Sequence, residues 1–262
     1  MRLEYPYYDI ILVNDGSKDE TLHILINHFD LIPVKWPFLA EIPTKEIKAI
    51  YKSRNKDFEK LIVVDKINGG KADALNAGIN ISENDFVACI DVDCMLSSDA
   101  LVKMIKPFLV EDNRRVIATG GVIRIANSCE IENGSVKRMR VPNNFLARVQ
   151  VLEYIRAIML GRMGWSKLDG LLLISGAFGL FRKEIVAACG GYDPNTVGED
   201  MELIVRMRRY MNDHNEKYTI TYIPDALCWT ECPESRSVLI KQRIRWTKGT
   251  IETLWKHRRL FL

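Results

Sequence analysis

The sequence predicts an α/β protein whose core is an open, mostly parallel β-sheet flanked by helices. Three short apolar runs, 9–13, 61–65 and 86–90, have the length and β-branched composition of buried strands. A segment with helical spacing of apolar residues follows each run, so the order is β-α-β-α-β-α. Carboxylates stand at the carboxyl ends of these runs, which is where ligands bind in such sheets.

Composition agrees with a globular protein and narrows the function classes. A chain of 262 residues suits one large domain or two small ones. Apolar residues make up 47% and charged residues 27%, which is ordinary for a folded protein. The net charge of +3 is too small to indicate a nucleic-acid partner, so we expect none.

Cysteine spacing and hydropathy indicate a chain without disulfides and without a membrane span of its own. The six cysteines show no paired C-x-x-C spacing, which favours reduced thiols over a disulfide framework or a zinc site. No signal-peptide pattern is present at the N-terminus. The longest apolar run, 171–181, is far shorter than the ~20 residues that a spanning helix needs.

The first strand leads into Asn14-Asp15-Gly16-Ser17, which places Asp15 at its carboxyl end. Ser17 and Glu20 have the S-x-x-E spacing of a capping box and predict a helix that begins there. Asp15 is either a turn-former or part of a ligand site, and the local pattern leaves both open.

Residues 32–57 contain three prolines and many lysines, and we interpret them as an irregular surface excursion. The strand 61–65 follows and ends near Gly69-Gly70-Lys71, at the start of a predicted helix. Free backbone N–H groups beside an ammonium group can bind an anion, although the P-loop spacing is absent. A glycine turn with a solvated lysine explains the same residues equally well.

The strand 86–90 ends in Asp91-Val92-Asp93, which is the stretch around which the rest of the chain is organised. Two carboxylates at one strand end repel each other unless a cation lies near them. Mg²⁺ is commonly held by one or two carboxylates together with substrate phosphates. The pair therefore indicates a metal–diphosphate site, with a solvated strand end as the plainer alternative. A helix is predicted from Ser98-Asp99.

The second half begins with a predicted strand at 116–125 and a polar turn at 127–133. A helix at 145–159, a loop at 161–168 and a buried strand at 171–174 follow. That strand leads into Ser175-Gly176-Ala177, where small residues suit close approach of a ligand to the backbone or tight core packing.

Gly198-Glu199-Asp200 opens another predicted helix, and acids in a first helical turn are also explained by the helix dipole. Two short strands are predicted at 219–223 and 226–229. The last element, 235–259, is a long basic amphipathic helix that suits an anionic membrane surface, phosphates or plain solvation.

Five motifs together resemble the family-2 glycosyltransferases, in particular the processive, membrane-bound synthases of cellulose, chitin, hyaluronan and poly-N-acetylglucosamine. They come in the family's order over about 8 to about 250, and five ordered motifs are far more specific than one. The motifs are Val13-Asn14-Asp15-Gly16-Ser17, Gly70-Lys71-Ala72-Asp73-Ala74-Leu75-Asn76, Asp91-Val92-Asp93, Gly198-Glu199-Asp200 and Gln242-Arg243-Ile244-Arg245-Trp246.

The resemblance implies a GT-A (Rossmann-like) fold and an inverting transfer from a nucleoside-diphosphate sugar to a glycan acceptor. It implies that Asp200, beside Glu199, is the general base and that Asp93, with Asp91, holds Mg²⁺ or Mn²⁺ against the diphosphate. The remaining implied roles are donor binding by Asp15, Lys71, Asp73, Asp91, Gln242, Arg245 and Trp246, and an acceptor side at Ser175, Gly176 and Ala177.

Two departures from the family pattern predict that the sequence is a fragment. The chain begins about one residue before the family's second strand, so we expect the first strand-helix unit to be missing and the chain alone to be inactive. The expected transmembrane helices are absent too, and the cytoplasmic face of the membrane is expected for the whole protein. We divide the chain into a catalytic domain at 1–234, with a donor half at about 1–112 and an acceptor half at about 113–234, and a basic interfacial helix at 235–262.

The resemblance favours UDP-N-acetylglucosamine or UDP-glucose as donor, and the motifs leave linkage, acceptor and oligomeric state open. Competing interpretations are a nucleotidyltransferase or non-processive glycosyltransferase, and a truncated, non-catalytic fragment that binds nucleotide. A phosphatase that uses its Asp-x-Asp pair is disfavoured, because its chemistry does not require Asp15, Asp200 or Gln242.

Overall fold

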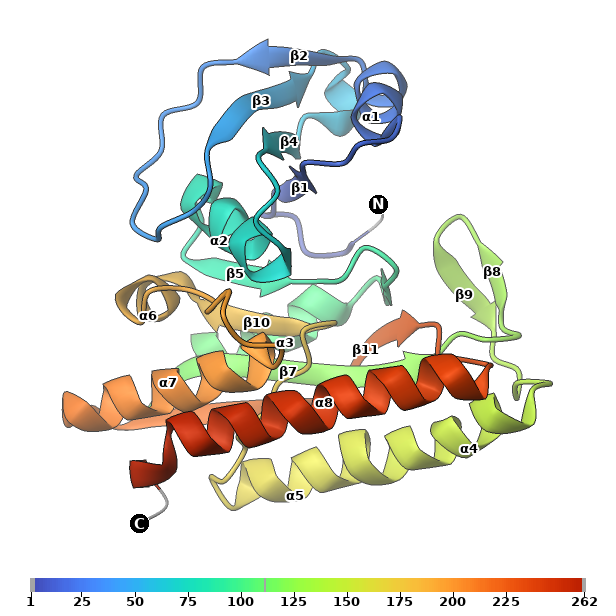
Figure 1. Cartoon of the computed structure of the whole chain (residues 1–262), viewed down its shortest axis with the longest axis vertical. Helices are drawn as coiled ribbons and strands as arrows, with labels where there is room; N and C mark the ends of the chain where they lie inside the picture. Colours follow the sequence, from blue (N-terminus) through green and yellow to red (C-terminus); the bar gives the residue numbers. More distant parts are fainter. Residues whose placement is uncertain (1–2, 111, 261–262) are drawn as a thin grey trace. The chain divides into compact units, whose positions relative to one another are not determined.

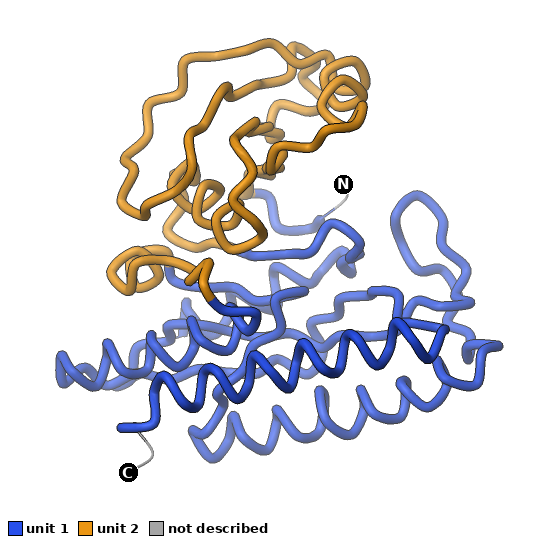
Figure 2. Tube along the Cα trace, viewed as in Figure 1, with its two compact units in different colours: residues 1–6, 88–182, 196–262 blue, residues 7–87, 183–195 orange. Residues whose placement is uncertain are grey.

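A computed structural model describes residues 3–110 and 112–260 and divides the chain into two compact units (Figure 2). Unit 1 takes its described residues from Met1–Pro6, Ala88–Arg182 and Thr196–Leu262. Unit 2 comprises Tyr7–Val87 and Lys183–Asn195. Each unit is built on its own β-sheet (Figure 1).

Unit 2 is a mixed sheet with the strand order β1-β4-β3-β2. Strands β1 and β4 are parallel, whereas β3 runs antiparallel to both β4 and β2. The strands are β1 (Ile10–Asp15), β2 (Leu31–Val34), β3 (Ile47–Ser53) and β4 (Leu61–Lys66), and the helices are α1 (Thr21–Phe29), the short 3₁₀ helix η1 (Lys56–Phe58), α2 (Lys71–Ile81) and α6 (Lys183–Ala188).

Strand β4 is the centre of the unit 2 core, since every one of its residues is buried. Leu61 and Val63 pack on one face of the sheet with the apolar side of α1, including Phe29. Ile62 and Val64 pack on the other face with Ile81 of α2 and with β1. This alternation of side chains explains why an uninterrupted apolar run forms a strand with a helix on each side.

Unit 1 is a second mixed sheet with the strand order β5-β10-β7-β11-β6. Strands β7 and β11 are parallel, and the β10–β7 and β11–β6 pairs are antiparallel. The strands are β5 (Phe86–Cys89), which crosses the boundary between the units, β6 (Met95–Leu96), β7 (Arg115–Ile125), β10 (Gly179–Arg182) and β11 (Tyr218–Thr230), with a separate hairpin of β8 (Glu130–Glu132) and β9 (Ser135–Arg138).

Helices cover both faces of the unit 1 sheet. The helix α3 (Ala100–Leu109) packs on β7, where the Thr119 hydroxyl donates to the Met104 carbonyl oxygen at 3.1 Å. A long segmented helix lies on the opposite face and consists of α4 (Phe145–Glu153), the π-helix η2 (Tyr154–Gly161) and α5 (Arg162–Lys167). The helix α8 (Arg236–Lys256) runs beside it (Figure 1), and α7 (Glu199–Asp213) and the short η3 (Arg258–Leu260) complete the unit.

The main correction to the predicted fold is that both sheets are mixed rather than mostly parallel. The region 32–57 is not an irregular excursion, because it contains β2, β3 and η1. Pro33 misled the prediction, since proline is tolerated in an edge strand and β2 is one of the two edge strands of its sheet.

Several local predictions were also wrong. The helix after Ser17 begins only at Thr21, whose backbone N–H donates to the Asp19 side chain at 3.1 Å, so Ser17 and Glu20 form no capping box. The predicted turn at 127–133 contains β8, which pairs with β9 across Asn133-Gly134, both at positive φ as in a tight hairpin turn.

The segment 145–174 also differs from its prediction. The predicted loop at 161–168 contains α5, and the predicted strand at 171–174 is buried chain outside any strand. The two strands predicted at 219–223 and 226–229 are one strand, β11, with an irregularity between Ile223 and Leu227.

Candidate functional site

In unit 2, Asp15 lies at the carboxyl end of β1 and accepts hydrogen bonds from the loop that precedes α2. Its carboxylate accepts from the backbone N–H groups of Gly69 at 2.9 Å and Gly70 at 2.7 Å, and from the Asn68 side chain at 3.2 Å. The two glycine N–H groups therefore do bind an anion, and that anion is the carboxylate of Asp15. Lys71 is exposed at the first position of α2.

A lysine that the sequence analysis overlooked joins two of the predicted donor-binding carboxylates. The buried Nζ of Lys66 lies 2.7 Å from Asp15 and 2.5 Å from Asp73. Burial alone lowers the pKa of Lys66, but the hydrogen bonds and charges of Asp15 and Asp73 outweigh it and raise the pKa above its ordinary value. The sequence signal was a lysine at the end of a mostly apolar strand, two residues after Val64, where a buried charge needs a partner.

Asp73 is buried and is tied to the chain before β3. Its two carboxylate oxygens accept from the backbone N–H of Lys45 at 3.0 and 3.3 Å. Asp15, Lys66 and Asp73 thus form one ion-pair network at the carboxyl ends of β1 and β4, which is the edge where α/β sheets bind ligands.

The Asp-x-Asp pair of unit 1 forms a turn directly after β5. The Cys94 N–H donates to the Asp91 carbonyl oxygen at 3.0 Å, which closes the turn and leaves Val92 97% exposed. Asp93 is exposed and Asp91 half-buried. The turn adjoins β11, because the strand that follows it, β6, pairs with β11 at Cys228 and Trp229. Hydrogen bonding with Cys94, burial and the charges of Asp91 and Asp93 raise the pKa of Cys228.

The Asp turn fits a divalent cation of the kind that also takes phosphate ligands. Within the described ranges no cluster of three or more His, Cys, Asp or Glu side chains could enclose a metal ion by itself. Two carboxylates on one exposed turn are the donor set that Mg²⁺ uses when substrate phosphates and water supply the remaining ligands.

Asp200, in the first turn of α7, is hydrogen-bonded to the predicted acceptor-side segment. One carboxylate oxygen accepts from the Gly176 N–H at 3.1 Å and the other from the Met201 N–H at 2.8 Å. Ser175, Gly176 and Ala177 form a half-buried turn before β10. The structure therefore brings together the predicted general base and the predicted acceptor side, while other lone pairs of the carboxylate stay available.

The Gln-x-x-Arg-Trp motif lies on the N-terminal half of α8, and Arg243 inside it acts as an anchor. Arg243 forms a 2.5 Å ion pair with Glu153 of α4, and its guanidinium lies 4.3 Å from the Trp246 ring centroid. Gln242, Arg245 and Trp246 share a helix face by their i, i+3, i+4 spacing. Arg245 and Trp246 are exposed, so this face is open to a ligand.

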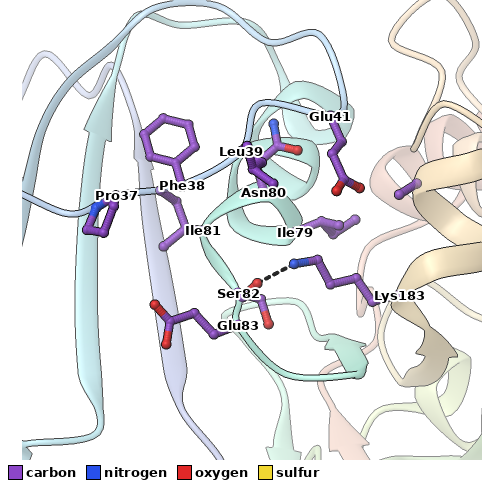
Figure 3. Close-up of a pocket in the computed structure, with 11 residues that line it drawn as sticks. Pro37, Phe38, Leu39, Glu41, Ile79, Asn80, Ile81, Ser82, Glu83 and Lys183 are labelled. Carbon is purple, nitrogen blue, oxygen red and sulfur yellow. Dashed lines mark hydrogen bonds between the residues drawn. The ribbon is translucent and has the colours of Figure 1, made fainter.

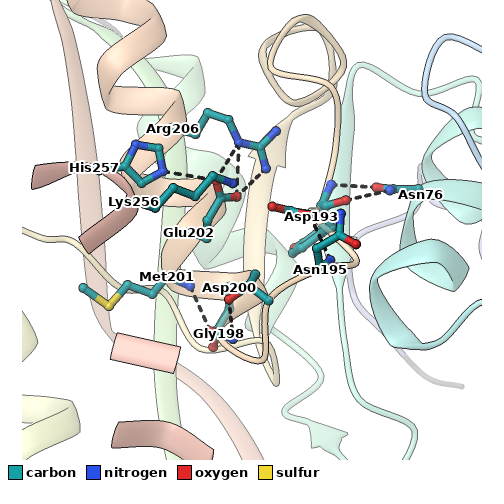
Figure 4. Close-up of polar contacts among 12 residues, drawn as sticks. Asn76, Asp193, Asn195, Gly198, Asp200, Met201, Glu202, Arg206, Lys256 and His257 are labelled. Carbon is teal, nitrogen blue, oxygen red and sulfur yellow. Dashed lines mark hydrogen bonds and ion pairs between the residues drawn. The ribbon is translucent and has the colours of Figure 1, made fainter. Parts of the chain in front are cut away.

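A second anchor joins α7 to the C-terminal end of α8 (Figure 4). The fully buried carboxylate of Glu202 accepts from Arg206, from Lys256 at 2.7 Å and from His257 at 3.1 Å. Burial raises the pKa of Glu202, but the hydrogen bonds and positive charge of these partners outweigh it and lower the pKa below its ordinary value. Near this anchor, Gly198 and Gly249 are so close that a Cβ on either would meet the other's backbone within 2.8 Å.

A pocket within unit 2 involves none of the predicted site residues. It has a volume of about 450 Å³ and is lined by residues of the 37–41 segment, the end of α2 and α6 (Figure 3). The ammonium group of Lys183, which reaches into it, donates to the Ser82 carbonyl oxygen. The ammonium group of Lys183 therefore already has a hydrogen-bond acceptor inside the pocket.

Comparisons with known proteins agree with the motif-based resemblance. The family model described as glycosyltransferase like family 2 matches residues 1–249. Proteins named poly-beta-1,6-N-acetyl-D-glucosamine synthase are similar in sequence: one from Staphylococcus epidermidis is 31% identical over 254 residues, and one from Staphylococcus aureus is 32% identical over 256. Each alignment covers 97% of this chain and 50% of the relative, so the chain spans about half the length of these relatives.

Two solved structures share the fold at low sequence identity. A mannosyltransferase from Pyrobaculum calidifontis in complex with GDP-Man and Mn²⁺ superposes over 98% of this chain and 57% of its own, with a TM-score of 0.62 and 15% identity. Residues 1–349 of S. aureus TarS, in complex with UDP-GlcNAc, superpose over 90% of this chain and 53% of their own, with a TM-score of 0.51 and 15% identity. The α/β fold is thus that of GT-A glycosyltransferases.

Proposed function

Because the chain belongs to glycosyltransferase family 2, we propose that it carries the catalytic residues of an inverting transferase that moves a sugar from a UDP-sugar to a glycan acceptor. The observation that carries this proposal is the contact between Asp200 and Gly176. It fixes a carboxylate at a helix start, next to a turn of small residues that leaves room for a sugar hydroxyl.

The proposed transfer needs one base, because the acceptor hydroxyl attacks the anomeric carbon opposite the departing diphosphate. The bond from the acceptor oxygen to the anomeric carbon forms while the bond from that carbon to the diphosphate oxygen breaks. Asp200 takes the hydroxyl proton, and the bonding electron pair leaves with UDP. Glu199, beside it in the first turn of α7, belongs to the same acidic pair.

For donor binding, we propose roles within each unit, taken by itself. In unit 2 the network of Asp15, Lys66 and Asp73 shapes the loop that receives the nucleoside, and Lys71 opens the following helix. In unit 1 the turn of Asp91 and Asp93 suits Mg²⁺ or Mn²⁺, which when bound neutralises charge on the leaving diphosphate. On α8, Arg245 offers a guanidinium for phosphate oxygens and Trp246 offers a flat ring for a sugar. Gln242 lies on the same helix face and is proposed to bind the donor with them.

N-acetylglucosamine is the sugar that we propose for the donor, with UDP-glucose as the competing choice. The support is that the relatives which align with 97% of this chain are named as synthases of a poly-N-acetylglucosamine. The full reaction, including polymer formation, is proposed for the whole protein, of which this chain corresponds to about half by the length of those relatives.

We further propose that α8 faces a membrane surface in the whole protein, at the cytoplasmic side. Exposed apolar residues on α8 include Ile240, Ile244, Ile251 and Trp255, interspersed with lysine and arginine, a pattern that suits an anionic lipid surface. Across the described residues, none of the helices combines the length and hydropathy needed to traverse a bilayer.

Calorimetric titration of UDP into the chain, with and without Mn²⁺, tests the proposal first. We expect Mn²⁺-dependent binding that Asp93→Ala abolishes. A control variant, Asp225→Asn, removes an exposed carboxylate of β11 in the same unit and is expected to bind UDP normally. Absence of UDP binding by a folded chain contradicts the proposal for this chain.

If UDP binds, incubation with UDP-N-acetylglucosamine, UDP-glucose and a short glycan acceptor identifies the transferred sugar. We expect N-acetylglucosamine to be transferred. Product length separates polymer synthesis from single-sugar transfer, and binding without any transfer by the wild-type chain identifies the non-catalytic alternative.

A further inference from the structure

In unit 1, two glycines from different elements are in direct backbone contact. Gly198 precedes the Glu199-Asp200 pair at the start of α7, and Gly249 lies within α8. A Cβ placed on Gly249 would lie 2.6 Å from the Cα and 2.8 Å from the nitrogen of Gly198. Carbon atoms in ordinary contact are about 3.5–4.0 Å apart. The absence of a side chain at both positions is therefore what allows the start of α7 to lie against α8.

Gly249 continues the helix face that carries the Gln-x-x-Arg-Trp motif. It lies three residues after Trp246, four after Arg245 and seven after Gln242, so all of these positions are on one side of α8. With a rise of about 1.5 Å per residue, Trp246 is only about 4.5 Å from Gly249 along the helix axis and Gln242 about 10 Å. The backbone that leads into Asp200 thus contacts α8 directly beside the motif.

Hydrogen bonds from the loop in front of α7 to a carboxylate of α8 accompany the glycine contact. The Glu252 carboxylate accepts from the Thr196 hydroxyl at 3.1 Å and from the Val197 N–H at 3.3 Å. The same Thr196 hydroxyl accepts from the Gly198 N–H at 3.2 Å. The Val197 hydrogen bond is the main cause that lowers the pKa of Glu252 below its ordinary value. Glu252 lies one helical turn after Gly249, so both residues of α8 hold the same stretch of loop.

The first turn of α7 transmits this contact to Asp200 (Figure 4). The Gly198 carbonyl oxygen accepts from the Glu202 N–H at 3.0 Å, so Gly198 is bonded into the helix that carries Asp200. The Asp200 carboxylate accepts from the N–H groups of Gly176 and Met201. A shift of the Gly198 backbone therefore moves Asp200 and changes its distance from Gly176.

The glycine contact has a different role from the Glu202 anchor. That anchor joins α7 to Lys256 and His257 at the end of α8 through side chains, and it requires no glycine at either helix. A contact between two backbones, in contrast, excludes any side chain and fixes their separation at van der Waals distance. What the glycine pair sets is a short distance between Asp200 and the motif face of α8.

We propose that Gly249 and Glu252 are positioning residues, which set the distance between Asp200 and the Gln-x-x-Arg-Trp face of α8. Both act through the loop 196–198 and contact no reacting atom. The inference rests on the proposed transferase function, in which Asp200 takes the acceptor proton while Arg245 and Trp246 bind the donor. Such a reaction depends on geometry, since a misplacement of about 1 Å can lower its rate about 100-fold.

Amide hydrogen exchange of the isotope-labelled chain, followed by NMR, tests the positioning without any need for activity. Gly249→Ala forces a Cβ against the Gly198 backbone, so the start of α7 must move. We expect the Gly176 N–H, which donates to Asp200, to exchange at least about tenfold faster in this variant. Gly164→Ala is the matched control, because it makes the same substitution in α5, where a Cβ meets no atom within 4 Å. Unchanged exchange at Gly176 in Gly249→Ala overturns the proposal.

Substitutions at Glu252 give a second test that introduces no clash and that decides the matter if Gly249→Ala does not fold. Glu252→Ala removes both hydrogen bonds to the loop, whereas Glu252→Gln keeps an oxygen that accepts one of them. We expect faster exchange at Gly176 in Glu252→Ala and partial rescue in Glu252→Gln. Lys248→Met, which removes only the ion pair of Glu252, is the control. If the amides of β7 exchange faster by the same factor as Gly176, the role is merely structural and the proposal is wrong.

Steady-state kinetics of sugar transfer separate positioning from donor binding. We expect Gly249→Ala to lower kcat about 100-fold and to leave the KM for the UDP-sugar within about threefold. A raised KM with unchanged kcat overturns the proposal, because the glycine contact then serves donor binding. A wild-type chain that neither binds UDP nor transfers sugar refutes the proposed function, whereas the exchange rates at Gly176 still decide whether Gly249 and Glu252 position Asp200.

Discussion

Two sets of buried polar groups in unit 1 differ in how their hydrogen-bonding atoms are satisfied. At Glu202 every charged group has an opposite partner: the carboxylate accepts from Arg206, Lys256 and His257. At Arg162 a buried guanidinium nitrogen has no hydrogen-bond acceptor among the described residues, and the buried Tyr222 hydroxyl has no partner there either.

The difference teaches which buried polar groups contribute to stability. The paired cluster has a partner for its buried carboxylate, although Nδ1 of His257 has none among the described residues, and it fixes the α7 backbone that carries Asp200 against the end of α8. Buried polar atoms without a partner are costly instead. Asp200 and Glu202 are only two residues apart in sequence, yet we expect substitution of Asp200 to reduce catalysis and substitution of Glu202 to reduce stability.

The largest expected effect is on catalysis, for Asp200→Asn. We expect the rate of sugar transfer to fall by about 10²- to 10⁴-fold, because the proposed base no longer takes the acceptor proton. UDP affinity is expected to remain nearly unchanged, since the variant keeps the side-chain shape. Rapid-quench or coupled assays of UDP release measure the rate, and Asp213→Asn at the exposed end of α7 is the control. Near-normal turnover in Asp200→Asn shows that the base lies elsewhere.

The next largest effect is on stability, for Glu202→Gln. Removing the charge leaves Arg206 and Lys256 without their carboxylate, and breaking a buried pair typically costs about 3–5 kcal/mol. Urea unfolding followed by tryptophan fluorescence measures the change in the free energy of unfolding. Glu216→Gln, which removes the partner of Arg115 at the surface, is expected to change it little. A stable Glu202→Gln variant shows that the paired cluster does not hold α7 to α8.

A smaller effect is expected in the pH dependence of stability. The pKa of Glu202 in the folded chain lies below its ordinary value of 4.5. A lowered folded-state pKa contributes stability that is present above the unfolded-state pKa and is lost as the pH falls through the folded-state pKa. We therefore expect the melting temperature of the wild-type chain to fall more steeply than that of Glu202→Gln as the pH decreases below the ordinary glutamate value of 4.5. If the melting temperatures of the wild-type chain and Glu202→Gln fall in parallel with pH, Glu202 is not the group that causes this pH dependence.

The sequence predicted the elements that depend on local pattern. The apolar run 61–64 forms most of β4, and the acidic start at Glu199 and Asp200 opens α7 because carboxylates favour a helix N-terminus. The long basic helix is α8. Sheet direction was not predictable in the same way, because apolar runs alone do not distinguish parallel from antiparallel neighbours.

The residues that the sequence analysis missed are those whose importance depends on distant partners. Lys66 gains its role from Asp15, which is 51 residues away in the chain. Arg162 lies in a segment that was predicted to be a loop but contains α5. Tyr222 is placed opposite Gly120 of β7 by the register of β11, which the sequence alone does not reveal. The Asn133-Gly134 hairpin, in contrast, had a local signal that the prediction overlooked.

The smallest expected effect concerns an orphaned hydroxyl on α8, one helical turn before His257 of the paired cluster. Thr253 is 1% exposed and its hydroxyl has no partner among the described residues. We expect Thr253→Val to leave the free energy of unfolding unchanged or raise it by up to about 1 kcal/mol, because no hydrogen bond is lost and a polar group leaves the interior. Ser166→Ala, by comparison, removes a hydroxyl with two hydrogen bonds and is expected to lower it by about 1–2 kcal/mol. Urea unfolding of the two variants measures both changes. A loss of stability in Thr253→Val shows that this hydroxyl does have a partner, such as a buried water, and that missing partners alone do not distinguish the two clusters.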